Sequence, residues 1–173
     1  KSLKREDFAA RCKPNVEVLI GGLRQRFEVK PIWVSPDADI AALSIVPPKE
    51  GFLPGDKKHE QRITLYPVKL ASDATLSKLK ALDKVYVIGF PLGMPNPKIS
   101  DGIIFPGDNG HFETSAPITR GNSGSPIYFA DTFEVISIAK YIYINGEGQQ
   151  MNHISGSVPI QFLKEAIKAG KLD

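Results

Sequence analysis

The feature that most constrains the fold is a series of short segments rich in β-branched and aromatic residues, separated by turn signals. The predicted strands are Val16–Ile20, Phe27–Val34, Ile40–Ile45, Ile63–Pro67, Lys84–Gly89, Gly102–Phe105, Pro126–Phe129, Val135–Ile144 and Ile154–Val158. Pairs such as Gly21-Gly22, Pro47-Pro48 and Asn145-Gly146 mark turns between them. Short strands at this spacing predict an all-β protein built as barrels or sandwiches.

Helices play a minor part in the predicted fold. One short helix is predicted over Thr75–Leu82, and a second over Pro159–Ala169, where three apolar residues share a face before Gly170. The segment Pro47–Arg62 is rich in proline, glycine and charge, which is typical of an exposed connector. We therefore predict two domains, residues 1–68 including the connector and residues 69–173 including the terminal helix.

Composition narrows the function without identifying it. The net charge is +3, and the basic residues are scattered rather than interleaved with aromatic residues, which argues against nucleic-acid binding. The single cysteine, Cys12, excludes an internal disulfide. No apolar run approaches the ~18 residues that would predict a membrane span, and the start of the sequence is charged rather than signal-like. Neither a metal nor a cofactor is implied.

The sharpest local motif is Thr119–Pro126, with the sequence TRGNSGSP. Glycines stand two residues before and one residue after Ser123, and they permit a tight turn that exposes its hydroxyl group. A serine in such a turn can attack a carbonyl group if nearby backbone N–H groups hold the oxyanion that forms. The alternative is a polar turn between strands, because glycine, asparagine and serine are common turn residues.

A second candidate is Asp39, which precedes a predicted strand of small and apolar residues. A carboxylate at such a strand end can orient an imidazole and stabilise its charged form. The alternative for the isolated motif is an aspartate that caps a turn after Pro36.

Five blocks, taken in order, resemble the trypsin-like serine proteases of the HtrA and glutamyl endopeptidase kind. The blocks are Val16–Gly22 leading through Arg26–Val34 to Pro36–Ala41, Lys84–Gly93, Ser100–Ile104, Ser115–Pro126 with Val135–Ile138, and Gly156–Ile160 before the last helix. The resemblance implies a chymotrypsin-like double β-barrel with a C-terminal helix. The first barrel is expected to be incomplete at its N-terminus, because only about three predicted strands precede Val46. The implied substrates are peptides or proteins, and an extracytoplasmic or secreted location is favoured by analogy alone.

The resemblance also implies roles for individual residues. Ser123 is the nucleophile and Asp39 the triad acid, while the backbone N–H groups of Gly121 and Ser123 form the oxyanion hole. Enzymes that mature by cleavage have an aspartate where this chain has Asn122, and an amide cannot pair with a new amino terminus. Activation by zymogen cleavage is therefore not expected.

The general base is the missing element, because no histidine lies among residues 1–38. The leading explanation is that the histidine lies upstream of Lys1, with a separate N-terminal fragment as one possible carrier. A second explanation is that Arg11, in Ala-Ala-Arg-Cys, replaces it in an inactive peptide-binding module, since a guanidinium cannot accept the serine proton. The third explanation assigns the role to one of the three histidines present, His59, His111 and His153.

The sequence gives only a weak indication of which substrate side chain is preferred. Pro117 stands where trypsin-like enzymes keep an aspartate that selects basic side chains, and Ala139 stands where glutamyl endopeptidases have a histidine. Neither preference is therefore supported. The expected pocket residues suggest a modest apolar side chain, and they are Ile118, Ala139, Ser155 and Gly156.

Overall fold

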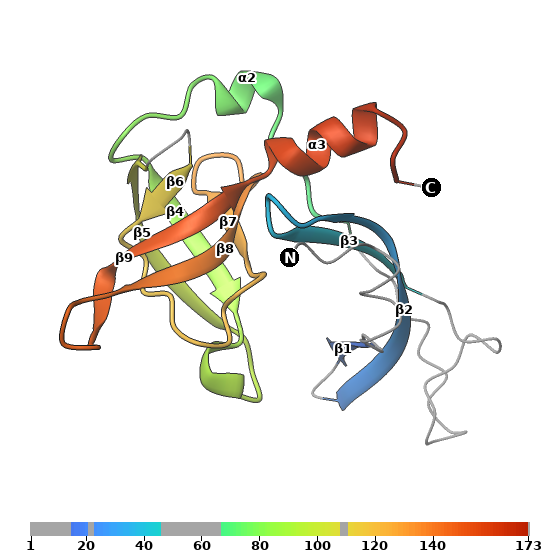
Figure 1. The fold of residues 1–173 in the computed structure, drawn as a ribbon, viewed down its shortest axis with the longest axis horizontal. Coiled ribbons are helices and arrows are strands. Elements are labelled where there is room, and N and C mark those ends of the chain that lie inside the picture. Colours follow the sequence, from blue (N-terminus) through green and yellow to red (C-terminus); the bar gives the residue numbers. More distant parts are fainter. Residues whose placement is uncertain (1–14, 21–22, 46–66, 108–110, 173) are drawn as a thin grey trace. The chain divides into compact units, whose positions relative to one another are not determined.

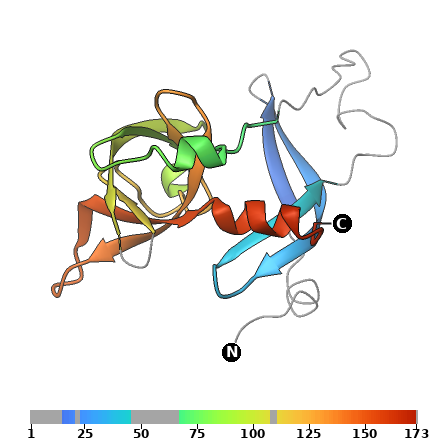
Figure 2. The ribbon, with the colours of Figure 1, turned by 90° about the horizontal axis from the view of Figure 1, so that it is seen from above.

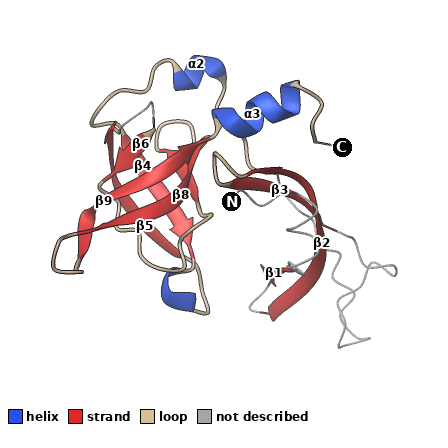
Figure 3. Cartoon of the chain, viewed as in Figure 1, coloured by secondary structure: helices blue, strands red, loops and turns tan. Residues whose placement is uncertain are grey.

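The computed structural model describes residues 15–20, 23–45, 67–107 and 111–172. The chain divides into two compact units, Lys1–Pro67 with Glu165–Asp173, and Val68–Lys164. Strands make up most of the regular structure in both units (Figure 3). No helix in these described ranges is long and apolar enough to cross a membrane.

The N-terminal unit contains a three-stranded antiparallel sheet in the order β1-β2-β3. Its strands are β1 (Asn15–Ile20), β2 (Leu23–Ser35) and β3 (Ile40–Ile45). Phe27 and Val29 are buried while Glu28 and Lys30 are exposed, which is the alternation of a strand with one covered face. The register shifts after Pro31, a residue without the N–H that a ladder needs. Of the predicted strand Ile63–Pro67, all but Pro67 lies outside the described residues.

The second unit is a closed six-stranded antiparallel barrel in the order β4-β5-β6-β9-β8-β7 (Figures 1 and 2). Its strands are β4 (Lys84–Gly89), β5 (Lys98–Pro106), β6 (Phe112–Thr114), β7 (Pro126–Phe129), β8 (Val135–Ile144) and β9 (Gln150–Pro159). The barrel and the C-terminal helix confirm the predicted all-β class. Strand β6 was not predicted, because three residues are too few to show a period.

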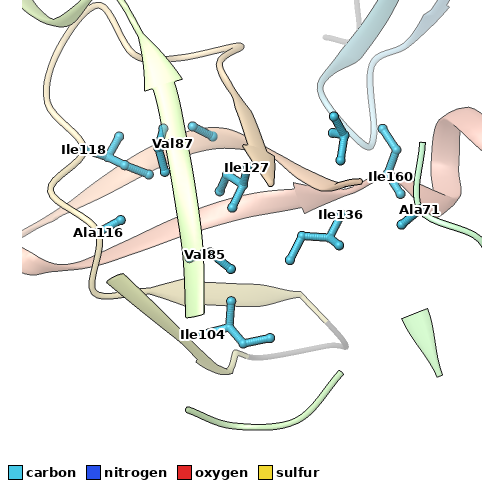
Figure 4. Packing of buried hydrophobic residues seen from close by; sticks show 11 residues of the cluster. Ala71, Val85, Val87, Ile104, Ala116, Ile118, Ile127, Ile136 and Ile160 are labelled. Carbon is cyan, nitrogen blue, oxygen red and sulfur yellow. The ribbon is translucent and has the colours of Figure 1, made fainter. Parts of the chain in front are cut away.

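The barrel is filled by branched aliphatic side chains from most of its strands (Figure 4). Val85 and Val87 of β4 are almost fully buried, with Ile127 of β7 and Ile136 of β8 in the same cluster. Each such side chain contributes about 1.5–3 kcal/mol through removal from water. This packing supports the loops that the barrel carries at its ends.

The helices are shorter than the sequence predicts. The predicted helix Thr75–Leu82 is wrong in its extent, because α2 spans Asp73–Leu76, where the Ser72 hydroxyl accepts from the Thr75 N–H at 3.0 Å. The next residues form turns that end at Leu82, whose φ is 75°. Helix α3 (Gln161–Lys168) starts after Pro159, which still pairs with β8.

Candidate active site

Ser123 lies in the loop that connects β6 to β7. The Asn122 N–H donates to the Thr119 carbonyl at 3.1 Å, and the Ser125 N–H donates to the Asn122 carbonyl at 2.9 Å, so two tight turns share Asn122 and the second contains Ser123. The flanking glycines, Gly121 and Gly124, have φ of 93° and 87°, values that only glycine adopts without strain. Ser123 is exposed at the top of this double turn.

The same loop is fastened to strand β8. The Gly124 N–H donates to the Ala139 carbonyl at 2.8 Å, and the Ala139 N–H donates to the Ser125 carbonyl at 2.9 Å. The Ser123 hydroxyl donates to the Lys140 carbonyl at 3.4 Å. Ser123 therefore lies directly beside the segment of β8 that begins at Ala139.

A second support comes from the end of β4. A Cβ atom at Gly89 would lie 2.1 Å from Ser125 Oγ and 2.7 Å from Asn122 Oδ1, so the buried side of the loop packs on bare backbone. Asn122 is 4% exposed, and its Oδ1 atom has no hydrogen-bond partner. The Asn122 side chain is thus neutral and tightly enclosed.

The peptide between Arg120 and Gly121 has a fixed orientation. The Leu92 N–H, from the short 3-10 helix η1 (Pro91–Gly93), donates to the Arg120 carbonyl at 2.6 Å. Because the C=O and N–H groups of a trans peptide point in opposite directions, the Gly121 N–H points away from Leu92. Neither the Gly121 N–H nor the Ser123 N–H has an acceptor among the described residues. The role of these two N–H groups in an oxyanion hole stays a prediction.

Asp39 belongs to the N-terminal unit and ends a turn. Its N–H donates to the Pro36 carbonyl at 3.2 Å, its φ is 55°, and β3 begins at the next residue. A turn after Pro36 and a position at the start of a strand are thus both present. The triad role of Asp39 stays a prediction.

Of the three histidines, only the side chain of His111 is described. Its Nδ1 atom donates to the Ser157 carbonyl at 3.1 Å, and its ring lies 6.4 Å from that of Phe162. Arg11 and His59 lie outside the described residues, and His153 is placed only as a backbone position of β9. No described imidazole is hydrogen-bonded to Ser123.

The four predicted pocket residues are all buried in the barrel unit. Ile118 and Ala139 belong to its hydrophobic core cluster. Gly156 pairs with Tyr141 across β8 and β9, and Ser155 pairs with Ile142. The described residues contain no group of three or more side chains that could hold a metal ion.

A protein-family model matches most of the sequence. The model of the trypsin-like peptidase domain matches residues 4–138. The chain belongs to this family. The match includes the Ser123 loop and ends within β8. No curated protein matches the sequence.

Two features of the described structure were not singled out from the sequence, the backbone N–H of Leu92 and the ring of Tyr141. Leu92 acts through its backbone N–H, and the turn signal Phe90-Pro91-Leu92-Gly93 is the only trace of that role in the sequence. Tyr141 contacts Gly156 across two strands. An aromatic residue two positions after Ala139 is a weak signal, because the contact depends on the strand register.

Proposed function

We propose that the protein is a serine endopeptidase in which Ser123 attacks the substrate peptide bond. Asp39 orients a histidine that lies outside residues 1–173, and this histidine takes the proton of the serine hydroxyl. The observation that carries the proposal is the turn around the exposed Ser123, in which Leu92 fixes the Arg120–Gly121 peptide. Neither the Gly121 N–H nor the Ser123 N–H has an acceptor among the described residues. A turn that served only to connect two strands would not need this orientation.

The proposed chemistry follows from these groups. Ser123 Oγ forms a bond to the carbonyl carbon while its proton passes to the imidazole, and the carbonyl oxygen becomes an oxyanion held by the Gly121 and Ser123 N–H groups. The C–N bond then breaks, and the imidazolium gives its proton to the leaving amine. Water attacks the acyl-enzyme by the same route and regenerates the serine. Asn122 supports a site that needs no cleavage for activation, since its neutral amide has no ion pair to form.

The test is covalent labelling of the full-length protein with an alkyl fluorophosphonate, followed by mass spectrometry of the modified peptide. We expect one adduct on Ser123, and none after Ser123→Ala. The matched control is Ser125→Ala, which removes the buried serine two residues away and should keep the adduct. Absence of labelling in the correctly folded full-length protein would overturn the proposal.

A rival function is a peptide-binding module of the same fold without catalysis. It is favoured by the absence of histidine from residues 1–38. This rival predicts that the full-length protein binds peptides but is not labelled at Ser123. A histidine just before Lys1 in the full gene would remove its main support.

A further inference from the structure

Tyr141 lies on strand β8, one residue after the residue whose backbone carbonyl contacts the candidate nucleophile. Lys140 precedes it, and the Lys140 carbonyl is the hydrogen-bond acceptor of Ser123 Oγ. The β8–β9 register shifts at this point, from Ala139 paired with Ser157 to Tyr141 paired with Gly156. Lys140 is the extra residue of the resulting bulge, and bulges of this kind change the direction in which side chains point. The bulge therefore decides where the Tyr141 ring lies relative to Ser123.

The ring of Tyr141 occupies the space of a side chain at position 156. A Cβ atom built on Gly156 would lie 2.0 Å from Cζ and 2.2 Å from Cε2 of the tyrosine, so the ring rests directly on the glycine backbone. Only glycine can accept a ring at this distance. Tyr141 is 37% exposed, so part of its surface remains accessible.

A second tyrosine holds this ring in place. The rings of Tyr141 and Tyr143 meet edge to face, with centroids 5.4 Å apart and planes at 76°. The Tyr143 hydroxyl donates to the Glu113 carboxylate, and Glu113 pairs with Gly156 from the other side, on β6. This bond to Glu113 raises the pKa of the Tyr143 hydroxyl, because the neutral phenol is the form that donates. The ring of Tyr141 is thus backed by contacts across three strands.

A substrate bound for attack at Ser123 lies close to this part of strand β8. The attacked carbonyl lies about 3 Å from Ser123 Oγ in any productive complex, and the Lys140 carbonyl lies 3.4 Å from the same atom. The residue that contributes the carbonyl is therefore adjacent to the segment 139–141. The Gln150 side chain donates to the Ile118 carbonyl at 2.7 Å, which ties the start of the nucleophile loop to β9 on the same side.

We propose that Tyr141 determines specificity by restricting this subsite to small side chains, such as those of alanine or serine. The inference rests on the proposed function of Ser123. The space that an open Gly156 would offer to a large substrate side chain is already filled by the tyrosine ring. Removal of the ring should therefore admit a larger residue before the cleaved bond.

Equilibrium binding of product peptides tests the inference without requiring catalysis. Two fluorescent peptides that differ only in a C-terminal alanine or phenylalanine are titrated with full-length protein. We expect wild type to bind the alanine peptide about tenfold more tightly than the phenylalanine peptide. Tyr141→Ala should bind the phenylalanine peptide about tenfold more tightly than wild type does. Tyr141→Phe keeps the ring and should keep the wild-type ratio. Tyr86→Ala is a matched truncation whose ring contacts are Phe133 and Lys84, and it should leave both affinities unchanged.

The outcomes separate this inference from the proposed function. Equal binding of the two peptides by wild type, or an unchanged ratio in folded Tyr141→Ala, would overturn the specificity role whatever the chemistry of Ser123. Failure of fluorophosphonate labelling with the peptide preference intact would instead overturn only the catalytic proposal. Circular dichroism and thermal unfolding check the fold. If Tyr141→Ala does not fold, Tyr141→Leu gives the same comparison with a smaller expected gain.

Discussion

Replacement of Gly121 by alanine tests the proposed oxyanion hole most directly. Its φ of 93° is unfavourable for any residue with a Cβ atom, which costs about 1–2 kcal/mol. The new Cβ would lie 2.7 Å from the Phe90 carbonyl oxygen and 2.9 Å from the Leu92 nitrogen. Both neighbours are backbone atoms, so the loop must move, and overpacking of this kind costs about 1–3 kcal/mol more. We expect a total loss of about 2–5 kcal/mol in the free energy of unfolding.

Gly124→Ala is the matched control in the same turn. Gly124 has a φ of 87°, but a Cβ atom there would have no neighbour within 4 Å. This variant introduces the backbone strain alone, so the expected loss in the free energy of unfolding is about 1–2 kcal/mol. The difference between the two variants isolates the contact with Phe90 and Leu92.

Activity should separate the variants further. Movement of the Gly121 N–H removes one oxyanion donor, which typically lowers the rate by about 10²–10³-fold. We expect this fall in the rate of fluorophosphonate labelling for Gly121→Ala, and a fall of less than about tenfold for Gly124→Ala. Urea unfolding gives the free energies, and time-resolved mass spectrometry gives the rates. Equal losses of stability and of labelling in the two variants would refute the reasoning.

Two further substitutions test the electrostatics of the barrel. Asn122→Asp should lower the free energy of unfolding at pH 7 by about 3 kcal/mol or more, because it buries a carboxylate where the amide oxygen has no partner. The loss should shrink at about pH 4, because burial raises the pKa of the new carboxyl above its ordinary value of about 3.9 and most of the acid is then neutral. An equal loss at both pH values in urea unfolding would contradict this. Glu134→Gln should destabilise the barrel at neutral pH, because hydrogen bonds from Lys69, 2.6 Å away, and from Thr75 lower the pKa of Glu134 from 4.5 to about 2. A carboxyl group whose pKa is lowered by folding stabilises the fold at pH values above its ordinary pKa of 4.5, and this stabilisation is lost as the pH falls through about 2. The urea midpoints of wild type and Glu134→Gln should therefore converge in acid. A gap between the midpoints that widens in acid would refute the stabilising role of ionised Glu134.

The short alternating segments determined the fold class and most of the strands. Ile40–Ile45, Lys84–Gly89, Pro126–Phe129 and Val135–Ile144 were predicted with the bounds that the structure shows. Periodicity in a strand depends on which face is buried, and it can be read from local residues. Strand β6 and the extent of α2 could not be read in this way, because a three-residue strand has no period and a helix end depends on turns beyond it.

The sequence by itself also predicted the local conformation of the loop that carries Ser123. Glycines on both sides of Ser123 predicted a tight turn, and in the structure Gly121 and Gly124 have positive φ. The sequence could not show that the Leu92 N–H fixes the Arg120 carbonyl, or that the Tyr141 ring rests on Gly156. Leu92 acts through a backbone atom that every residue except proline carries. Tyr141 meets Gly156 only because a bulge sets the register of β8 against β9. Residue type specifies what a group can do, whereas barrel closure and strand register decide which groups meet, and no local pattern in the sequence encodes those long-range pairings.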